Sequence, residues 1–387
     1  MAIKTNTWST PDDFPGDDTQ MVQACVDAAQ PGTEMRFPRQ YVVSSEIDFV
    51  GKLNLVVAGP GGINFIGTNT QRSALSLVGA DALTFRDFKV HSSGQAFPPR
   101  AIIAIGRKEG SYQGSRCQFH GSVIDGYATD AGVYSIASEV CTWKENYISL
   151  HGGGGKKTVY ISQQDDLGLG GIKAETYLTG WWANNTIANA SEDEDAAALF
   201  IYGRGETGNL SFRDNYLTGK NGSAIEVFGG KPSQAYGPFV FDHCYMESNS
   251  NLTQFVKFNA EGDIVTWMSG LKFRDCYGLG PAEWFFYSAD NVILSRSTFD
   301  SNLANEDSSF YGLEYTTLNE HYGNIEARYV ANYCYGFVNR AAGGSVFNPG
   351  SGYANILADK GRLILSGTNN VRYRIEIVDG IVTAVPH

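Results

Sequence analysis

The sequence predicts an all-β fold, a right-handed parallel β-helix with an N-terminal capping helix and a small C-terminal β-module. Two features of the chain indicate this class. Only 18% of the 387 residues are charged, while 45 are glycine, 22 phenylalanine and 21 tyrosine. Abundant glycine and aromatic residues with few charges favour short strands joined by turns. A seven-residue pattern also returns along the chain at variable intervals, which is typical of a solenoid with loops of different lengths.

In the repeated pattern, positions one and three are apolar and positions two and four are mostly polar, the alternation of a strand with one buried face. Positions five and six are rich in Asp, Asn and Ser, which tolerate a tight bend or a left-handed backbone. Position seven is apolar or aromatic again, so we expect a new strand that faces the same core. Copies begin at Cys117, Cys141, Trp181, Leu210, Phe239, Leu271, Ile293 and Ala327, with an earlier, imperfect copy at Leu83.

A further strand is predicted just before each new copy, so that each coil carries about three. These strands are expected at 158–162, 199–202, 225–228, 255–258 and 284–287. In-register stacking of coils leaves the Cβ vectors of neighbouring cysteines parallel, a poor disulfide geometry. We therefore expect Cys117, Cys141, Cys244 and Cys276 to remain free thiols.

Both ends of the chain differ from the repeat. Val22, Cys25, Val26 and Ala29 lie on one face of a predicted helix at 18–30, which begins at an Asp/Thr cap and stops at Pro31-Gly32. It would cover the first coil. We expect the cap at 1–45, the β-helix at 46–340, and at 341–387 a module for oligomerisation. That module contains a strand over 353–366 and a hairpin over 375–385 that turns at Asp379-Gly380.

The opening of the chain resembles the pectate-lyase-like β-helix superfamily. The resemblance lies in Gly16-Asp-Asp-Thr19, the helix after it, Pro31-Gly32, and Phe37-Pro-Arg-Gln-Tyr-Val-Val43, with Gln40 where glycine is usual. A β-helix with a compact C-terminal β-module is most similar to phage tailspike polysaccharide depolymerases. The resemblance implies a homotrimer that cleaves surface glycans, with a polysaccharide as its partner. Inulin and levan fructotransferases and several polysaccharide lyases share the fold, so the fold alone selects no reaction.

Outward positions of the strand before each copy are candidates for chemistry. Along the rod we expect Tyr160, Phe200, Glu226, Lys257 and Phe286 in one row, with Tyr202 and Phe228 one step along. Aromatic rings stack on the C–H faces of sugars, and a carboxylate and an amine bind hydroxyls. The competing interpretation is that Glu226 and Lys257 form an ordinary surface ion pair.

Hydrolysis of a glycosidic bond needs two carboxyl groups beside it. We predict Glu226 as the general acid, because its aromatic neighbours would partly exclude water, although Lys257 opposes that effect. Asp195, Glu206 and Asp166, in that order, are candidates for the other carboxyl group. The predicted substrate-binding residues are Tyr160, Phe200, Tyr202, Phe228, Lys257, Arg204 and Lys231. The acidic run Ser191-Glu-Asp-Glu-Asp195 favours a solvated loop, or at most a calcium site. No cofactor and no other metal is expected, because the histidines show no ligand spacing.

The sequence favours an endo-acting glycan hydrolase. The alternatives are a polysaccharide lyase or fructotransferase, which would need a base and a cation, and a non-catalytic glycan-binding fibre. The formal net charge of −12 argues against nucleic acid as a partner, and no apolar segment is long enough to insert into a membrane. The N-terminus lacks the apolar run of a secretory signal. We expect an extracellular protein or a part of a virion.

Overall fold

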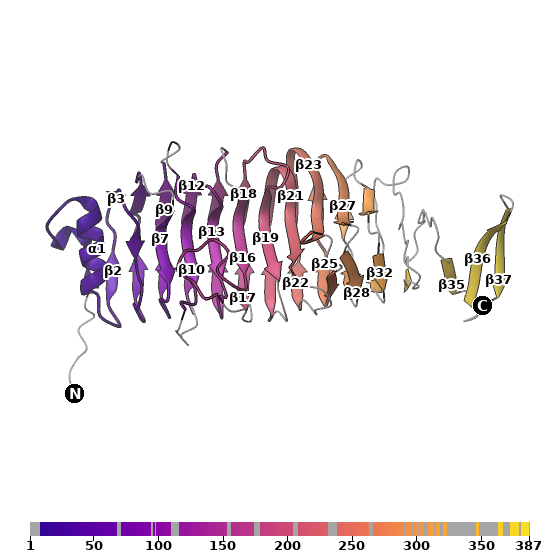
Figure 1. The fold of residues 1–387 in the computed structure, drawn as a ribbon, viewed down its shortest axis with the longest axis horizontal. Coiled ribbons are helices and arrows are strands. Elements are labelled where there is room, and N and C mark those ends of the chain that lie inside the picture. Colours follow the sequence, from indigo (N-terminus) through magenta and orange to yellow (C-terminus); the bar gives the residue numbers. More distant parts are fainter. Residues whose placement is uncertain are drawn as a thin grey trace, which may run out of the picture.

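The computed structural model confirms an all-β parallel solenoid of about 8 turns, drawn out as a rod in Figure 1. The structure describes residues 8–67, 71–93, 96, 98–109, 116–152, 156–173, 179–203, 208–230, 238–262, 266–289, 292–295, 297–300, 302–304, 309–312, 315–317, 320–322, 346–347, 363–366, 372–378 and 381–386. The helix at the N-terminal end is the only α-helix in these residues, and it is too short to span a membrane.

One face of the rod is a parallel sheet of thirteen strands in the described part of the chain. In order, it is built from β1 (Trp8–Ser9), β2 (Glu34–Arg36), β5 (Val56–Ala58), β8 (Thr84–Arg86), β11 (Gln118–His120), β14 (Cys141–Lys144), β17 (Gly180–Ala183), β20 (Leu210–Arg213), β22 (Phe239–Asp242), β25 (Leu271–Arg274), β29 (Thr298–Asp300), β33 (Glu320–Tyr322) and β34 (Val346–Phe347).

Two further ladders of parallel strands complete each coil. The first ladder contains β3 (Gln40–Val43), β6 (Gly62–Phe65), β9 (Lys89–Ser92), β12 (Val123–Gly126), β15 (Tyr147–Leu150), β18 (Thr186–Asn189), β26 (Tyr277–Leu279) and β30 (Leu303–Ala304). The second contains β4 (Ile47–Asp48), β7 (Ser73–Val78), β10 (Ala101–Gly106), β13 (Ala131–Ile136), β16 (Lys157–Ser162), β19 (Ala197–Gly203), β27 (Ala282–Ser288) and β31 (Ser309–Gly312). Two long strands, β21 (Tyr216–Gly229) and β23 (Tyr245–Ala260), run through both ladders.

The rest of the described chain forms two small sheets. β24 (Thr266–Ser269), β28 (Val292–Ser295) and β32 (Tyr315–Thr317) pair in parallel. β35 (Leu363–Ser366), β36 (Arg372–Val378) and β37 (Ile381–Pro386) form an antiparallel sheet. β36 and β37 pair antiparallel, as the predicted hairpin requires, while the turn residues Asp379 and Gly380 lie outside the described residues.

The capping helix α1 (Asp18–Ala28) follows a short 3-10 turn at Pro11–Asp13. Asp17 is its N-cap: its carboxylate accepts a hydrogen bond from the Gln20 backbone at 2.9 Å, and the Gln20 side chain accepts one from the Asp17 backbone at 3.1 Å. This reciprocal cap satisfies two backbone N–H groups. The helix buries the face predicted from sequence, Val22, Cys25, Val26 and Ala29, against the first coils.

Inside the rod, the third position of the repeat forms a continuous stack of aromatic rings. Phe119 and Trp143 lie with centroids 4.0 Å apart and planes within 3°, and Trp143 stacks on Trp182 at 4.7 Å and 5°. The stack includes Phe85, Phe119, Trp143, Trp182, Phe212, Phe241, Phe273 and Phe299. Parallel strands in register bring identical positions of successive coils face to face, so the repeat in sequence becomes a column in space.

The bend after this strand uses the fifth and sixth positions of the repeat. The fifth position has a positive φ, as at Glu145 (59°) and Asn184 (55°), which confirms the left-handed turn. The sixth position carries buried asparagines: Asn146 and Asn185 donate their side-chain N–H groups to the next asparagine's oxygen, both at 2.9 Å. This internal ladder of asparagines provides hydrogen-bond partners for the backbone N–H and C=O groups that the bend removes from the sheet.

The seventh position differs from the prediction. Tyr147 is 45% exposed and points outward, while the following residue, Ile148, is buried in the core. The new strand begins at Tyr147 as expected, but its first inward-facing residue comes one position later. The register of two copies differs from the prediction. Trp182, not Ala183, is the buried third-position ring, so that copy begins at Gly180, and Phe299, not Ser295, takes the third position in a later coil. Consecutive aromatic or apolar residues in these segments leave the period-2 pattern ambiguous by one step.

The cysteines are free and buried at Cys25, Cys117, Cys141, Cys244 and Cys276, as expected. Cys334 lies outside the described residues. Burial raises the pKa of the Cys117 and Cys276 thiols, so these side chains act as small apolar groups.

Candidate active site

The outward row expected on the second ladder exists. The Cα partners across β16, β19, β21, β23 and β27 are Tyr160, Phe200, Glu226, Lys257 and Tyr287. The expectation of Phe286 at the end of the row is wrong, because that ring pairs with Val256 and is fully buried in the core. The run from Trp284 to Tyr287 is entirely aromatic, so polarity alone does not reveal which rings face inward.

Glu226 lies at the centre of this row and is only 4% exposed. One carboxylate oxygen is 3.0 Å from Lys157 Nζ, and the other is 3.8 Å from Lys257 Nζ and accepts a hydrogen bond from Asn259 Nδ2 at 3.1 Å. Two ammonium groups and an amide thus surround the carboxylate. The predicted pair of Glu226 and Lys257 is therefore real, but it is buried and is shared with a second, closer lysine.

Lys157 connects Glu226 to the acidic loop at 191–195. Its Nζ donates a hydrogen bond to the backbone carbonyl of Asp195 and lies 4.3 Å from the centroid of the Phe200 ring. The Asp195 side chain is 72% exposed and sits 3.9 Å from Lys156 Nζ. The backbone of Asp195, the first candidate for the second carboxyl group, thus contacts the lysine that holds Glu226, while its carboxylate lies beside Lys156.

The loop itself is held by ion pairs. Asp193 accepts a hydrogen bond from the Asp195 backbone at 2.9 Å and lies 3.2 Å from Lys156 Nζ. The backbone hydrogen bond, and to a lesser degree Lys156, lower the pKa of Asp193. Glu192 pairs with Lys220. The acidic run is thus anchored by lysines on neighbouring coils.

The predicted aromatic residues pack on one another in a cluster of Tyr160, Phe200, Tyr202 and Phe228. Phe200 contacts Tyr160 edge-on at 4.8 Å and Phe228 at 5.7 Å, and Tyr202 contacts Phe228 at 5.1 Å. Phe200 and Tyr202 are each 7% exposed, whereas Tyr160 and Phe228 are half-buried. Only the latter two rings present appreciable surface.

Phenol hydroxyls at both sides of the cluster bind carboxylates. Tyr160 donates to Asp166 at 3.1 Å, and Tyr202 donates to the exposed Glu261 at 3.0 Å. Asp166 also accepts hydrogen bonds from Ser162 and, at 3.0 Å, from Gln164. Burial, and next the Asp166 charge, raise the pKa of Tyr160, so this phenol remains a donor at neutral pH.

Three predicted site residues, Glu206, Arg204 and Lys231, lie outside the described residues. Sequence reasoning missed Lys157 and Asn259 as partners of the site. The register explains the omission: Lys157 is 69 residues from Glu226, and only the stacking of coils brings them together.

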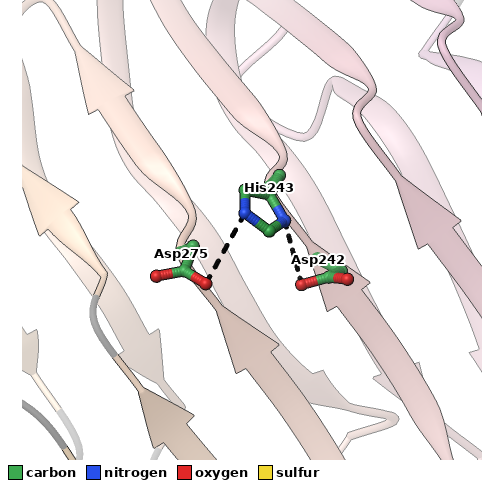
Figure 2. A group of neighbouring side chains, drawn as sticks. All are labelled: Asp242, His243 and Asp275. Atoms are coloured by element: carbon green, nitrogen blue, oxygen red, sulfur yellow. Dashed lines mark ion pairs between the residues drawn. The ribbon is translucent and has the colours of Figure 1, made fainter.

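A second polar group lies at the bend between β22 and the strand after it (Figure 2). His243 Nδ1 is 3.1 Å from Asp242 and its Nε2 is 3.7 Å from Asp275. These are ligand types for a metal ion, and the three groups lie within 4.8 Å of one another. The Arg274 guanidinium, however, binds both oxygens of Asp242 at 2.8 Å and is the main cause of its lowered pKa. A guanidinium already neutralises the cluster, so we assign no metal to it.

The fold of this chain is a right-handed parallel β-helix. No protein-family model matches the chain, and no curated protein sequence matches it closely. Among solved structures, Geobacillus virus E2 ORF18 is 14% identical with a TM-score of 0.53, covering 98% of this chain and 76% of that one. A hyperthermoactive exopolygalacturonase from Thermotoga maritima is 10% identical with a TM-score of 0.52, covering 82% of this chain and 91% of that one.

Proposed function

We propose that this protein is a polysaccharide depolymerase, an endo-acting hydrolase that cleaves glycosidic bonds in a bacterial surface polysaccharide or exopolysaccharide, outside the cell or on a virion. The similarity in fold to an exopolygalacturonase and to a viral protein supports this class without selecting a substrate. The support that comes from the chain itself is the concentration of carboxylates and aromatic rings on one outward face of consecutive coils.

The observation that carries the proposal is the Glu226 carboxylate on the outward aromatic face, held by Lys157, which also binds the backbone carbonyl of Asp195. Hydrolysis needs one carboxyl group that donates a proton and one that is charged. Glu226, beside two ammonium groups, suits the charged role of base or nucleophile, which differs from the acid role its aromatic neighbours first suggest. We assign the remaining role of proton donor to Asp195, because its backbone binds the lysine that holds Glu226.

For Glu226 to reach a sugar, one of its partners must move. The contact with Lys257 at 3.8 Å is looser than the contact with Lys157 at 3.0 Å. We propose that substrate hydroxyls replace the Lys257 ammonium, while Lys157 and Asn259 hold the carboxylate in place. The half-buried rings of Tyr160 and Phe228 would then contact the sugar, with Arg204 and Lys231 as further binding residues.

The burial of Glu226 also favours a second candidate function, a fibre module that binds glycan without cutting it. In that case the carboxylate only stabilises the coil, and no second carboxyl group is needed. A lyase would use the same face differently, with the lysines stabilising its anionic, enolate-like intermediate.

The decisive experiment incubates the protein with a panel of bacterial capsular polysaccharides and exopolysaccharides. Newly formed reducing ends and the ultraviolet absorbance of unsaturated sugars are followed together. Reducing ends alone indicate hydrolysis, both signals together indicate a lyase, and glycan binding with neither signal indicates the fibre module. Transfer of fructosyl units would release oligosaccharide product without a matching increase in reducing ends.

The catalytic assignment is tested with Asp195→Asn, which keeps the shape of the side chain but removes its carboxyl group. Because positioned proton donors contribute about a hundredfold or more to rate, activity should fall by that factor. Glu145→Gln is the matched control: its side chain is 59% exposed, in a turn between β14 and β15. Equal activity of both variants would remove Asp195 from the site.

A further inference from the structure

A row of tyrosines lies on the outward face of the first ladder, on strands that the proposed active site does not use. Tyr216, Tyr245 and Tyr277 are Cα partners on β21, β23 and β26, and Tyr147 holds the same place on β15. All four occupy the seventh position of the repeat. Inside the rod the stacked rings are Phe and Trp, whereas this outer row consists of Tyr, whose hydroxyl can reach solvent.

Three members of the row fill consecutive coils. The rings of Tyr216 and Tyr245 stack with centroids 5.3 Å apart and planes 17° apart, and Tyr245 and Tyr277 follow at 5.3 Å and 33°. The hydroxyl of Tyr216 donates a hydrogen bond to Glu247. These contacts cover one face of the Tyr216 ring and fix its orientation.

The row is interrupted at one coil. Between Tyr147 and Tyr216, the corresponding residue on β18 is Thr186, and the next outward position on that strand is Ala188. Tyr147 is 45% exposed. Adjacent parallel strands are about 4.8 Å apart, so these two tyrosine positions are separated by about 9.6 Å with only small side chains between them.

Stacked rings prefer centroid distances of about 4.5 Å or more. The gap between the two tyrosine positions is about twice that distance, so it has room for one further ring stacked between them. A single six-membered ring placed above Thr186 would stack on Tyr147 on one side and on Tyr216 on the other. A pyranose presents C–H groups on both faces and hydroxyls around its edge. The hydroxyls of Tyr147, Thr186 and Tyr216, with Glu247 beside them, are suitable hydrogen-bond partners for that edge.

We propose that Tyr147, Thr186 and Tyr216 form a second, non-catalytic sugar-binding site that holds one pyranose ring between two phenol rings. The formal charge of −12 disfavours a phosphorylated ligand, such as a nucleotide, that could also stack there. Every side chain of the site carries a hydroxyl, which favours a sugar over an apolar aromatic compound. The site requires no catalysis and does not depend on the proposed depolymerase activity.

The test is saturation-transfer NMR with methyl α-glucopyranoside and methyl β-galactopyranoside, each on the order of 10 mM, where single-sugar contacts are measurable. Neither compound is a polysaccharide, so the readout is independent of depolymerisation. The deciding variant is Thr186→Tyr, which continues the row and fills the space. Val240→Tyr, at an outward position on β22 in the other sheet, adds the same ring elsewhere and serves as the matched control.

We expect saturation transfer to at least one glycoside in the wild-type protein and in Val240→Tyr, and a several-fold loss in Thr186→Tyr. Tyr147→Ala should show the same loss with an unchanged melting temperature, because its side chain is already exposed. The proposal is overturned if neither glycoside receives saturation from the wild-type protein, or if Thr186→Tyr binds as the wild type does. Failure here with continued depolymerase activity would leave the active-site proposal standing.

Discussion

The carboxylate of Glu226 lies 3.0 Å from the ammonium group of Lys157, although the two residues are 69 positions apart and belong to strands two coils apart. Their side chains are 5% and 13% exposed. A buried ion pair with this geometry is costly to break, because removing one charge leaves the other without a partner in a site that water does not reach.

Glu226→Gln is therefore expected to affect stability as well as activity. Breaking a buried pair typically costs about 3–5 kcal/mol, which denaturant unfolding monitored by circular dichroism would measure. The double variant Glu226→Gln/Lys157→Met should recover part of that loss, since it removes the unpaired ammonium, while activity stays at least about a hundredfold lower. An undiminished unfolding free energy in the single variant would contradict the buried pair, and full activity would contradict the catalytic role.

The asparagine ladder inside the bend makes a second prediction. The Asn185 side chain donates to the Trp143 carbonyl at 2.9 Å and accepts from the Asn146 backbone at 3.0 Å. Asn185→Ala leaves these buried groups unpaired and should lower the free energy of unfolding by at least about 2 kcal/mol. The neighbouring Asn184 has a φ of 55°, so Asn184→Gly should be close to neutral. Equal effects of the two substitutions would contradict this account.

Stability at alkaline pH should depend on Tyr216. Burial, followed by its hydrogen bond with Glu247, raises the pKa of Tyr216 from 10.0 to about 12. A phenol whose pKa is higher in the folded state contributes stability that is fully present below the unfolded value and is lost as pH rises through the folded value. Between pH 10 and pH 12 the melting temperature of the wild type should thus fall more steeply with pH than that of Tyr216→Phe. Parallel curves would show that the tyrosine is not coupled to folding.

The C-terminal module leads to a prediction about assembly. Its apolar residues Ile356, Leu363, Ile375, Ile377, Ile381 and Val385 belong to a segment of fewer than 50 residues, too short to bury them alone. We propose that the strands β35, β36 and β37 associate in a homotrimer with a cyclic interface. Light scattering at micromolar concentration should give about three times the chain mass of 42.1 kDa. A single-chain mass would contradict this, and a chain truncated at residue 340 should be the monomeric control.

The sequence alone determined the solenoid, because each coil repeats the same alternation of inward and outward residues followed by a bend. It also determined the buried face of α1 and the left-handed fifth position, because each depends on a short local pattern. The adjacency of Glu226 and Lys257 was predictable too, because these residues occupy the same position in two neighbouring coils. Only the tertiary structure decided that Lys157 reaches Glu226, that Tyr147 points outward and that Phe286 points inward. Loops of variable length separate the coils, so the residues that meet across two of them have no fixed spacing in the chain. Where consecutive residues are all aromatic, the pairing with the neighbouring strands, and not polarity, decides which ring enters the core.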